Sequence, residues 1–194
     1  MPPKTKVSRE EIVCAAVALV RERGEAALNA RDLAASLACS TQPIFFNFKS
    51  MAELRRAVLE VANQRYLAYR EEDMQSGEFP PYKASGMSYI RFATEEKELF
   101  KMLFMRDRST DAVAFDDEEE MDPIYDLVQK QLAVSREEAR IFHLENWAVV
   151  HGIAAMTVTG YLQLEKDVVS RMLTDTYLGL KARYEQRRRE DERH

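Results

Sequence analysis

The sequence predicts an all-α protein, and three observations support that prediction. Only 6 Gly and 6 Pro occur in 194 residues, of which 46% are hydrophobic and 31% charged, a composition typical of a helical globular chain. Apolar residues recur at the spacing of one helix face, as in Ile12, Ala16, Leu19 and Val20. Sustained period-two alternation and the dipeptides of tight hairpin turns are absent, so we expect no strands.

Three of the expected helices open with the pattern Ser-x-x-Glu, in which the serine hydroxyl caps the helix and the glutamate returns a hydrogen bond. The pattern occurs at residues 8–11, 50–53 and 135–138. The first helix should end at Gly24, because glycine readily adopts the conformation that terminates a helix. The helix that opens at Ser50 should continue to about residue 74.

Two short helices are expected between the first and fourth helices. One covers residues 30–37 and is capped by Asn29. The other covers residues 41–47 and is capped by Ser40, which places Pro43 in the first turn, where a missing amide costs little. We then expect a turn at 76–81 and one or two helices at 82–106. An acidic solvated loop should follow and end at 116–120, before a helix capped by Asp122 with Pro123 as its first residue. The last two helices should cover about 135–161 and 165–188.

The charge distribution separates the head of the chain from its body. The net charge is −5, but residues 1–56 carry nine Lys and Arg against six acids, which gives +3, and the remainder carries −8. A cationic head on an anionic body suits a nucleic-acid partner for the head alone.

Several other classes of protein are not expected. The longest apolar run, residues 12–20, is far shorter than the roughly 20 residues that cross a bilayer. The N-terminus lacks the apolar stretch of a signal peptide, and the two cysteines are Cys14 and Cys39. We therefore expect no membrane association, a cytoplasmic location and free thiols.

Residues 31–54 predict a helix-turn-helix, in which the second short helix enters a major groove. Ile44 and Phe48 are four residues apart and should face inward as anchors. A side-chain amide on the outer face can read adenine, aromatic edges can touch a thymine methyl, and flanking cations can contact phosphates. The expected DNA-binding residues are Arg31, Thr41, Gln42, Phe45, Phe46, Asn47 and Lys49.

An ordinary helical bundle with an aromatic core is the alternative to this interpretation. Phe45, Phe46 and Phe48 fall within four consecutive residues, so they cannot all point inward from one helix. At least one ring must then be exposed or meet a partner, which favours the DNA-binding interpretation.

The helix-turn-helix residues resemble the TetR family of bacterial one-component transcription regulators. The resemblance covers residues 8–56 and rests on Arg-Asp-Leu-Ala at 31–34, Ser-Thr-Gln-Pro-Ile-Phe-Phe-Asn-Phe at 40–48 and Glu-Leu at 53–54. In the second half, the stretch 147–152 is similar to a Trp-to-His-Gly stretch in the penultimate helix of that family. The resemblance implies a homodimer that binds double-stranded operator DNA with two inverted half-sites.

The resemblance also implies a DNA-binding domain at residues 1–56 and a helical ligand-binding and dimerisation domain at 57–194. A small apolar or amphipathic ligand would enter the second domain and release the DNA. Burial in the core is the alternative for each candidate ligand contact, namely Phe92, Phe104, Met105, Phe142, Asn146, Trp147 and His151. Motifs for phosphate loops, nucleophile elbows and paired carboxylates are absent, so we expect no catalytic residue, metal or cofactor.

Three positions depart from the family pattern. Ala38 stands at the turn glycine, Phe45 at a tyrosine that contacts phosphate, and Met51 at a lysine of the fourth helix. Two phosphate contacts are thereby lost and the salt dependence of DNA binding weakens, although Lys49 can replace part of the lost charge. A helical ligand- or protein-binding module with weakened DNA readout is therefore an alternative function.

The last two helices carry apolar stripes that could pair across a two-fold axis or be buried within one chain. The stripes are Val149, Ile153 and Met156 on one helix and Val169, Met172, Leu173, Thr176 and Leu180 on the other. His143 and His151 share a face of the first of these helices and are the only support for a small enzyme or a metal site.

Overall fold

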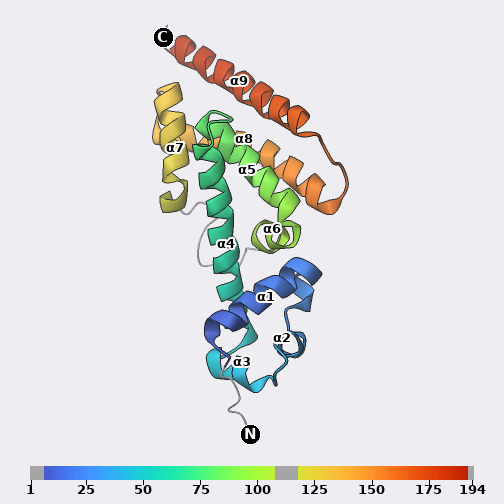
Figure 1. Cartoon of the computed structure of the whole chain (residues 1–194). Coiled ribbons are helices and arrows are strands. Elements are labelled where there is room, and N and C mark those ends of the chain that lie inside the picture. The colour runs from blue at the N-terminus through green and yellow to red at the C-terminus, as the bar shows by residue number, and fades with distance from the viewer. Residues whose placement is uncertain (1–6, 108–117, 192–194) are drawn as a thin grey trace. The chain divides into compact units, whose positions relative to one another are not determined.

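The computed structural model describes residues 7–107 and 118–191, and within them the chain forms nine α-helices, one short 3-10 turn and no strand. The all-α prediction is confirmed. The chain divides into two compact units. Figure 1 colours the helices from blue at the N-terminus to red at the C-terminus. The described residues of the first unit are 7–67 and 95–106, and those of the second are 68–94, 107 and 118–191.

The first unit holds the predicted helix-turn-helix and a later segment of the chain that the predicted division at residue 56 assigned to the body. Helix α1 contacts α2, α3 and α6 within this unit. The elements are α1 (Arg9–Arg23), the 3-10 turn (Glu25–Ala27), α2 (Ala30–Ser36), α3 (Gln42–Asn47), the first part of α4 (Met51–Gln75) and α6 (Lys97–Phe104).

The second unit is built from the end of α4 and four further helices. Helix α8 contacts both α7 and α9. The four helices are α5 (Pro81–Glu95), α7 (Glu118–Leu132), α8 (Arg136–Thr159) and α9 (Lys166–Asp191).

The predicted capping signals operate at both ends of α1 and at the start of α8. The hydroxyls of Ser8 and Ser135 accept hydrogen bonds from the amides of Glu11 and Glu138, and each glutamate returns a bond to its serine. These bonds hold both carboxylates ionised, so the pKa of Glu11 and that of Glu138 lie below the ordinary value. Gly24 ends α1 with φ +78, a conformation that glycine adopts without strain.

Two predicted helix starts are wrong. Helix α3 begins at Gln42, with Thr41 at the cap position and no side-chain capping bond, so Ser40 is not its cap. Helix α7 begins at Glu118 rather than at Pro123, so residues 118–120 are helical and not loop. Residues 116–117 lie outside the described part of the chain. Pro123 removes only one hydrogen bond from α7, and the buried Ile124 and Tyr125 pack the helix against the core.

The first unit contains a buried carboxylate held by two arginines. Glu96 lies between α5 and α6, and its side chain is 3% exposed. Arg21 of α1 donates to both its oxygens, at 2.6 and 3.0 Å, and Arg65 of α4 donates from Nε and Nη2 at 2.7 and 2.6 Å. One carboxylate therefore ties the start of α6 to both α1 and α4.

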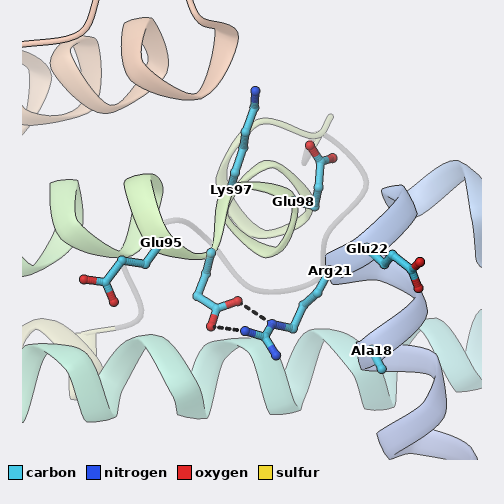
Figure 2. Close-up of a pocket in the computed structure, with 7 residues that line it drawn as sticks. Ala18, Arg21, Glu22, Glu95, Lys97 and Glu98 are labelled. Atoms are coloured by element: carbon cyan, nitrogen blue, oxygen red, sulfur yellow. Dashed lines mark hydrogen bonds and ion pairs between the residues drawn. The ribbon is translucent and has the colours of Figure 1, made fainter.

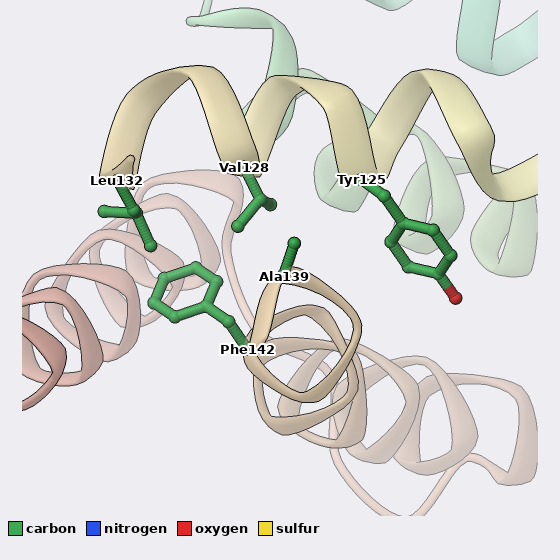
Figure 3. Packing of buried hydrophobic residues seen from close by; sticks show 5 residues of the cluster. All are labelled: Tyr125, Val128, Leu132, Ala139 and Phe142. Atoms are coloured by element: carbon green, nitrogen blue, oxygen red, sulfur yellow. The ribbon is translucent and has the colours of Figure 1, made fainter. Parts of the chain in front are cut away.

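An aromatic and aliphatic cluster forms the core of the second unit between α7 and α8. Figure 3 shows Tyr125, Val128 and Leu132 of α7 directed toward Ala139 and Phe142 of α8. The rings of Tyr177 and Tyr184 from α9 meet Phe142 edge-on, with centroids 5.5 and 5.3 Å away. Helix α8 is therefore packed between α7 and α9 through one phenylalanine.

The predicted dimer stripes are partly buried within the chain. Ile153, Val169 and Leu173 are buried within the chain, and Met172 is exposed. The exposed apolar side chains of α8 and α9 include Ile141, Leu144, Val168, Met172 and Leu178, and of these only Met172 belongs to the stripes. Both faces of these helices carry apolar residues, and only the packing decides which face is inward.

Replacing Glu96 by Gln should lower the free energy of unfolding by about 1–3 kcal/mol, because two guanidinium groups lose their charged acceptor. Glu98→Gln is the control, since Glu98 is partly exposed and pairs with Lys101, a surface contact worth about 0.5 kcal/mol or less. Urea unfolding of the full chain at one protein concentration measures both. Equal stability of the two variants would show that Glu96 does not anchor α6.

Candidate functional site

Helix α3 is anchored by the two side chains that the sequence predicted. Ile44 and Phe48 are fully buried in the first unit, while Phe45 is 51% and Phe46 is 84% exposed. A phenyl ring that is mostly in water is unfavourable for an isolated chain, because apolar surface gains free energy only when it is covered. The outer face of α3 therefore offers two adjacent rings to a partner.

The start of α3 and its flanks place polar and cationic groups beside these rings. Thr41 and Gln42 are exposed at the first turn, and Lys49 is exposed just beyond the last turn. Arg31 is exposed in the first turn of α2, where the Asn29 side-chain oxygen accepts the amide of Arg31 at 3.1 Å. These groups lie at the surface of the unit that carries Phe45 and Phe46.

Asn47 differs from the other predicted DNA contacts because the protein itself uses its amide. Its Nδ2 donates to the carbonyl oxygen of Pro43 at 2.9 Å and to that of Val7 at 3.3 Å, and the residue is half-buried. The side-chain amide of Gln42 is exposed and makes no such bond within the described residues. Gln42 is thus the better placed of the two amides to read a base.

The turn between α2 and α3 contains a left-handed alanine. Ala38 has φ +49, a conformation that costs a residue with a Cβ atom roughly 1–2 kcal/mol relative to the right-handed one. The TetR pattern has a glycine at this position, and the positive φ explains why. The turn keeps its shape with alanine and carries the strain.

A hollow of about 370 Å³ opens in the first unit and is lined mainly by charged residues. Figure 2 shows Arg21, Glu22 and Ala18 of α1 on one side and the acidic junction of α5 and α6 on the other. Its lining does not match the apolar pocket expected for a ligand, since Glu22, Lys97 and three further glutamates surround it. The dashed bonds in Figure 2 are those of the Arg21–Glu96 pair.

The seven candidate ligand contacts do not form one cluster within one unit. Phe104 and Met105 belong to the first unit, where the Phe104 ring lies edge-on to Tyr66 with centroids 5.3 Å apart. The other five belong to the second unit, and they divide among separate contacts. The ring of Phe92 lies edge-on to that of Tyr69. The backbone carbonyl of Phe142 accepts a hydrogen bond from the side-chain amide of Asn146 at 2.8 Å. The ring of Trp147 stacks on that of His151.

Both histidines of α8 meet tyrosine hydroxyls of α5. Nδ1 of His143 lies 3.2 Å from the Tyr82 hydroxyl, and Nδ1 of His151 lies 2.9 Å from that of Tyr89. Burial raises the pKa of Tyr82, so its hydroxyl stays protonated. Burial lowers the pKa of His151, whose ring also stacks on Trp147 with centroids 4.7 Å apart. Each pair joins α5 to α8.

Among the described residues, no group of three or more His, Cys, Asp and Glu side chains is placed to hold a metal ion. None of the described helices combines the length and the apolarity needed to cross a bilayer.

Three contacts of the first unit were not predicted from the sequence. Arg9 and Glu53 surround the C-terminal end of α3, and Glu96 holds α6 in the first unit. All three residues are charged, and a sequence does not distinguish a solvated charge from a paired one.

Known proteins match the chain in its second half and in its fold. Residues 82–176 match the family model of the tetracyclin repressor-like C-terminal domain. A TetR-like transcriptional regulator from Rhodococcus sp. RHA1 has a TM-score of 0.65 at 16% identity, over 88% of this chain and 94% of that chain. No curated protein matches the sequence.

Two other solved structures share the fold. A TetR family protein from Vibrio parahaemolyticus has a TM-score of 0.57 at 15% identity, over 87% of this chain and 96% of that chain. The multidrug binding protein EbrR, complexed with imidazole, has a TM-score of 0.56 at 17% identity, over 87% of this chain and 88% of that chain.

An all-helical chain with a helix-turn-helix head and a regulator-type body defines the class of helical transcription regulators. The match of the body and the motif of the head agree on one family within this class. Residues 82–176 belong to the TetR C-terminal domain family, and the whole chain has the fold of TetR-like regulators.

The neutral His151 should make the fold sensitive to acid. Its folded pKa is lowered by burial, so its contribution to stability is complete above the unfolded pKa of about 6.5 and is lost as the pH falls below that value, until the folded pKa is reached. Denaturant unfolding of the wild type and of His151→Gln between pH 7.5 and 5 tests this, because the carboxylates titrate in both proteins. The wild type should lose more stability than the variant, and parallel pH profiles would contradict the prediction.

Proposed function

We propose that this protein is a TetR family transcriptional repressor that reads an inverted-repeat operator with α3, acts as a homodimer and releases DNA when a small molecule binds its second unit. One observation carries the DNA-binding part. The outer face of α3 exposes Gln42, Phe45 and Phe46 over the buried anchors Ile44 and Phe48. A repressor acts on chromosomal DNA, so the proposal includes a cytoplasmic location.

The chemistry of this face suits the major groove. A helix of roughly 10–12 Å diameter fits a groove about 12 Å wide. The Gln42 amide can pair with the N6 and N7 groups of an adenine, and the edges of Phe45 and Phe46 can cover thymine methyl groups. Lys49 and Arg31 are exposed at the borders of the face, where they would contact phosphates and fix the register.

The homodimer is proposed from the exposed apolar face of α8 and α9. Ile141 and Leu144 on α8 and Val168 and Met172 on α9 are exposed in the single chain. Gly152 and Gly179 lie within these helices. A Cβ at either position would meet no other part of the described chain within 4 Å, apart from the backbone of its own helix. Glycine costs a helix about 1 kcal/mol relative to alanine, so its presence here suits the close approach of a partner helix.

The ligand part of the proposal requires a difference in affinity between two states. A ligand lowers DNA affinity only by as much as it prefers the state that does not fit the operator. The aromatic contacts of the second unit, including Phe92, Trp147 and His151, are the proposed lining for a small apolar or amphipathic compound. The structural neighbour EbrR is a multidrug binding protein, which agrees with such a ligand class.

Duplexes selected from a random pool by the wild type should contain two inverted half-sites, since each protomer of a symmetric dimer reads one. Gln42→Ala should relax the preference at one base of each half-site by about 1–3 kcal/mol. Lys49→Ala should weaken binding to all sequences and reduce the salt slope by about 0.9 per protomer. Fluorescence anisotropy at several salt concentrations measures both effects.

Lys130→Ala is the matched control, because Lys130 is an exposed cation on α7. It should leave affinity and base preference unchanged. If Gln42→Ala and Lys49→Ala also bind like the wild type, the proposed recognition face is wrong. If the wild type binds no duplex even at low salt, the alternative of a ligand- or protein-binding module is favoured, with Phe45 and Met51 as the residues that weaken DNA readout.

Leu144→Glu should shift the protein from dimer to monomer and lower operator affinity at least about tenfold, because a carboxylate at the α8 interface would lose its hydration without gaining a partner. Sedimentation equilibrium measures the oligomeric state directly. Lys130→Glu makes a charge change outside α8 and α9 and should remain dimeric. A monomeric wild type, or a dimeric Leu144→Glu, would remove this face as the interface.

A further inference from the structure

The C-terminal end of α3 is held by a side chain from the start of α1. Helix α3 has six residues and no side-chain capping bond, so it has little stability of its own. Nη1 of Arg9 donates to the Asn47 carbonyl oxygen at 2.8 Å and to Oε1 of Glu53 at 3.2 Å. One guanidinium group therefore bridges the end of α3 and the start of α4.

The same guanidinium also covers one of the two buried anchors. Its central carbon lies 4.0 Å from the centroid of the Phe48 ring, the range of a cation–π contact. The two hydrogen bonds and the ring contact together fix where the guanidinium lies relative to α3. A planar group is needed to make all of them at once.

The partners of Arg9 are themselves fixed by the backbone. Oε2 of Glu53 accepts the amide of Lys49 at 2.8 Å, and the hydroxyl of Ser50 accepts the amide of Glu53 at 3.2 Å. The hydrogen bond from Lys49 is the main reason that the pKa of Glu53 is lowered, and Arg9 adds to it. Glu53 is thus an ionised acceptor with a defined position.

Asn47 completes this set of contacts from the other side. Its side-chain amide bonds to Val7, two residues before Arg9, and to Pro43 at the start of α3. The segment that contains Val7 and Arg9 therefore holds both the backbone and the side chain of the last residue of α3.

We propose that Arg9 is a positioning residue for DNA recognition, which holds the recognition helix through the Asn47 carbonyl, the Glu53 carboxylate and the Phe48 ring, with Asn47 acting as part of this tether rather than as a base contact. The proposal rests on the DNA-binding function proposed above. It differs from a direct phosphate contact by Arg9, which the exposure of the side chain would also allow.

Two substitutions separate a tether from a phosphate contact. Lysine at position 9 keeps the charge but cannot form the planar fork, so Arg9→Lys should impair a tether and spare a phosphate contact. Glu53→Gln removes a negative charge from the head of the chain. Electrostatics alone would then strengthen DNA binding, whereas loss of the tether weakens it.

Hydrogen–deuterium exchange of the DNA-free protein tests the tether without any DNA. The amide of Phe48 donates to Ile44 at 2.9 Å and reports the last turn of α3. In Arg9→Lys and Glu53→Gln, peptides that cover residues 44–48 should exchange several-fold faster than in the wild type, while peptides of α8 remain unchanged. Unaltered exchange at 44–48 in both variants would overturn the proposal.

Arg55→Lys provides a matched control in the same unit. Arg55 pairs with Glu25 at 3.0 Å, and the two side chains are 48% and 34% exposed, close to the 47% and 29% of Arg9 and Glu53. The control should leave the exchange of α3 as in the wild type. Faster exchange of α3 in this variant would show that any arginine of the head has the same effect, and would also overturn the proposal.

Fluorescence anisotropy with the selected duplex then tests the consequence for recognition. Arg9→Lys and Glu53→Gln should each lower affinity roughly tenfold, about the value of one hydrogen bond to a charged group, with base preference and salt slope unchanged. Wild-type affinity in Arg9→Lys, or tighter binding in Glu53→Gln, would assign Arg9 to a phosphate and overturn the proposal. A wild type that binds no duplex would reject the proposed function, while the exchange measurement still decides whether Arg9 holds α3.

Discussion

A helix of six residues does not hold its shape in water, so the proposed recognition face depends on the burial of two side chains. Ile44 and Phe48 are fully buried, and each contributes roughly 1.5–3 kcal/mol by leaving water. Their spacing of four places them on one face of α3 and directs the residues between them outward. The exposure of Phe45 and Phe46 is therefore a consequence of the anchors rather than a separate feature.

The anchors act within a unit that is assembled from two distant parts of the sequence. Residues 95–106 return to α1, and their buried Leu99, Phe100 and Met102 complete the core of the first unit. Glu96 is the one buried carboxylate among the described residues, and its two arginines come from α1 and α4. Breaking a buried pair costs far more than forming it gains, so this contact specifies one packing of α6 more than it adds stability.

Features set by local chemistry could be predicted from the sequence. The capping boxes at Ser8 and Ser135 and the inward direction of Ile44 and Phe48 need only neighbouring residues, and all are observed. Features set by tertiary packing could not. The buried faces of α8 and α9 and the return of residues 95–106 to the head depend on partners far away in the sequence. The internal bonds of Asn47 go to backbone carbonyls, which every residue carries and which therefore give no signal in the sequence.

The same distinction separates the two kinds of DNA contact in the proposed site. Residue type alone makes Gln42 and Asn47 equal candidates for a base contact, since both carry a side-chain amide. In the structure the amide of Gln42 is exposed, whereas that of Asn47 is hydrogen-bonded within the protein. Two phenyl rings occupy the centre of the exposed face, and a net charge of −5 gives the whole chain little long-range attraction for DNA. Affinity would then rest on short-range contacts to bases, which require a helix held in one position. A rigid tether at the end of α3 matters more in such a protein than in one whose phosphate contacts tolerate small displacements.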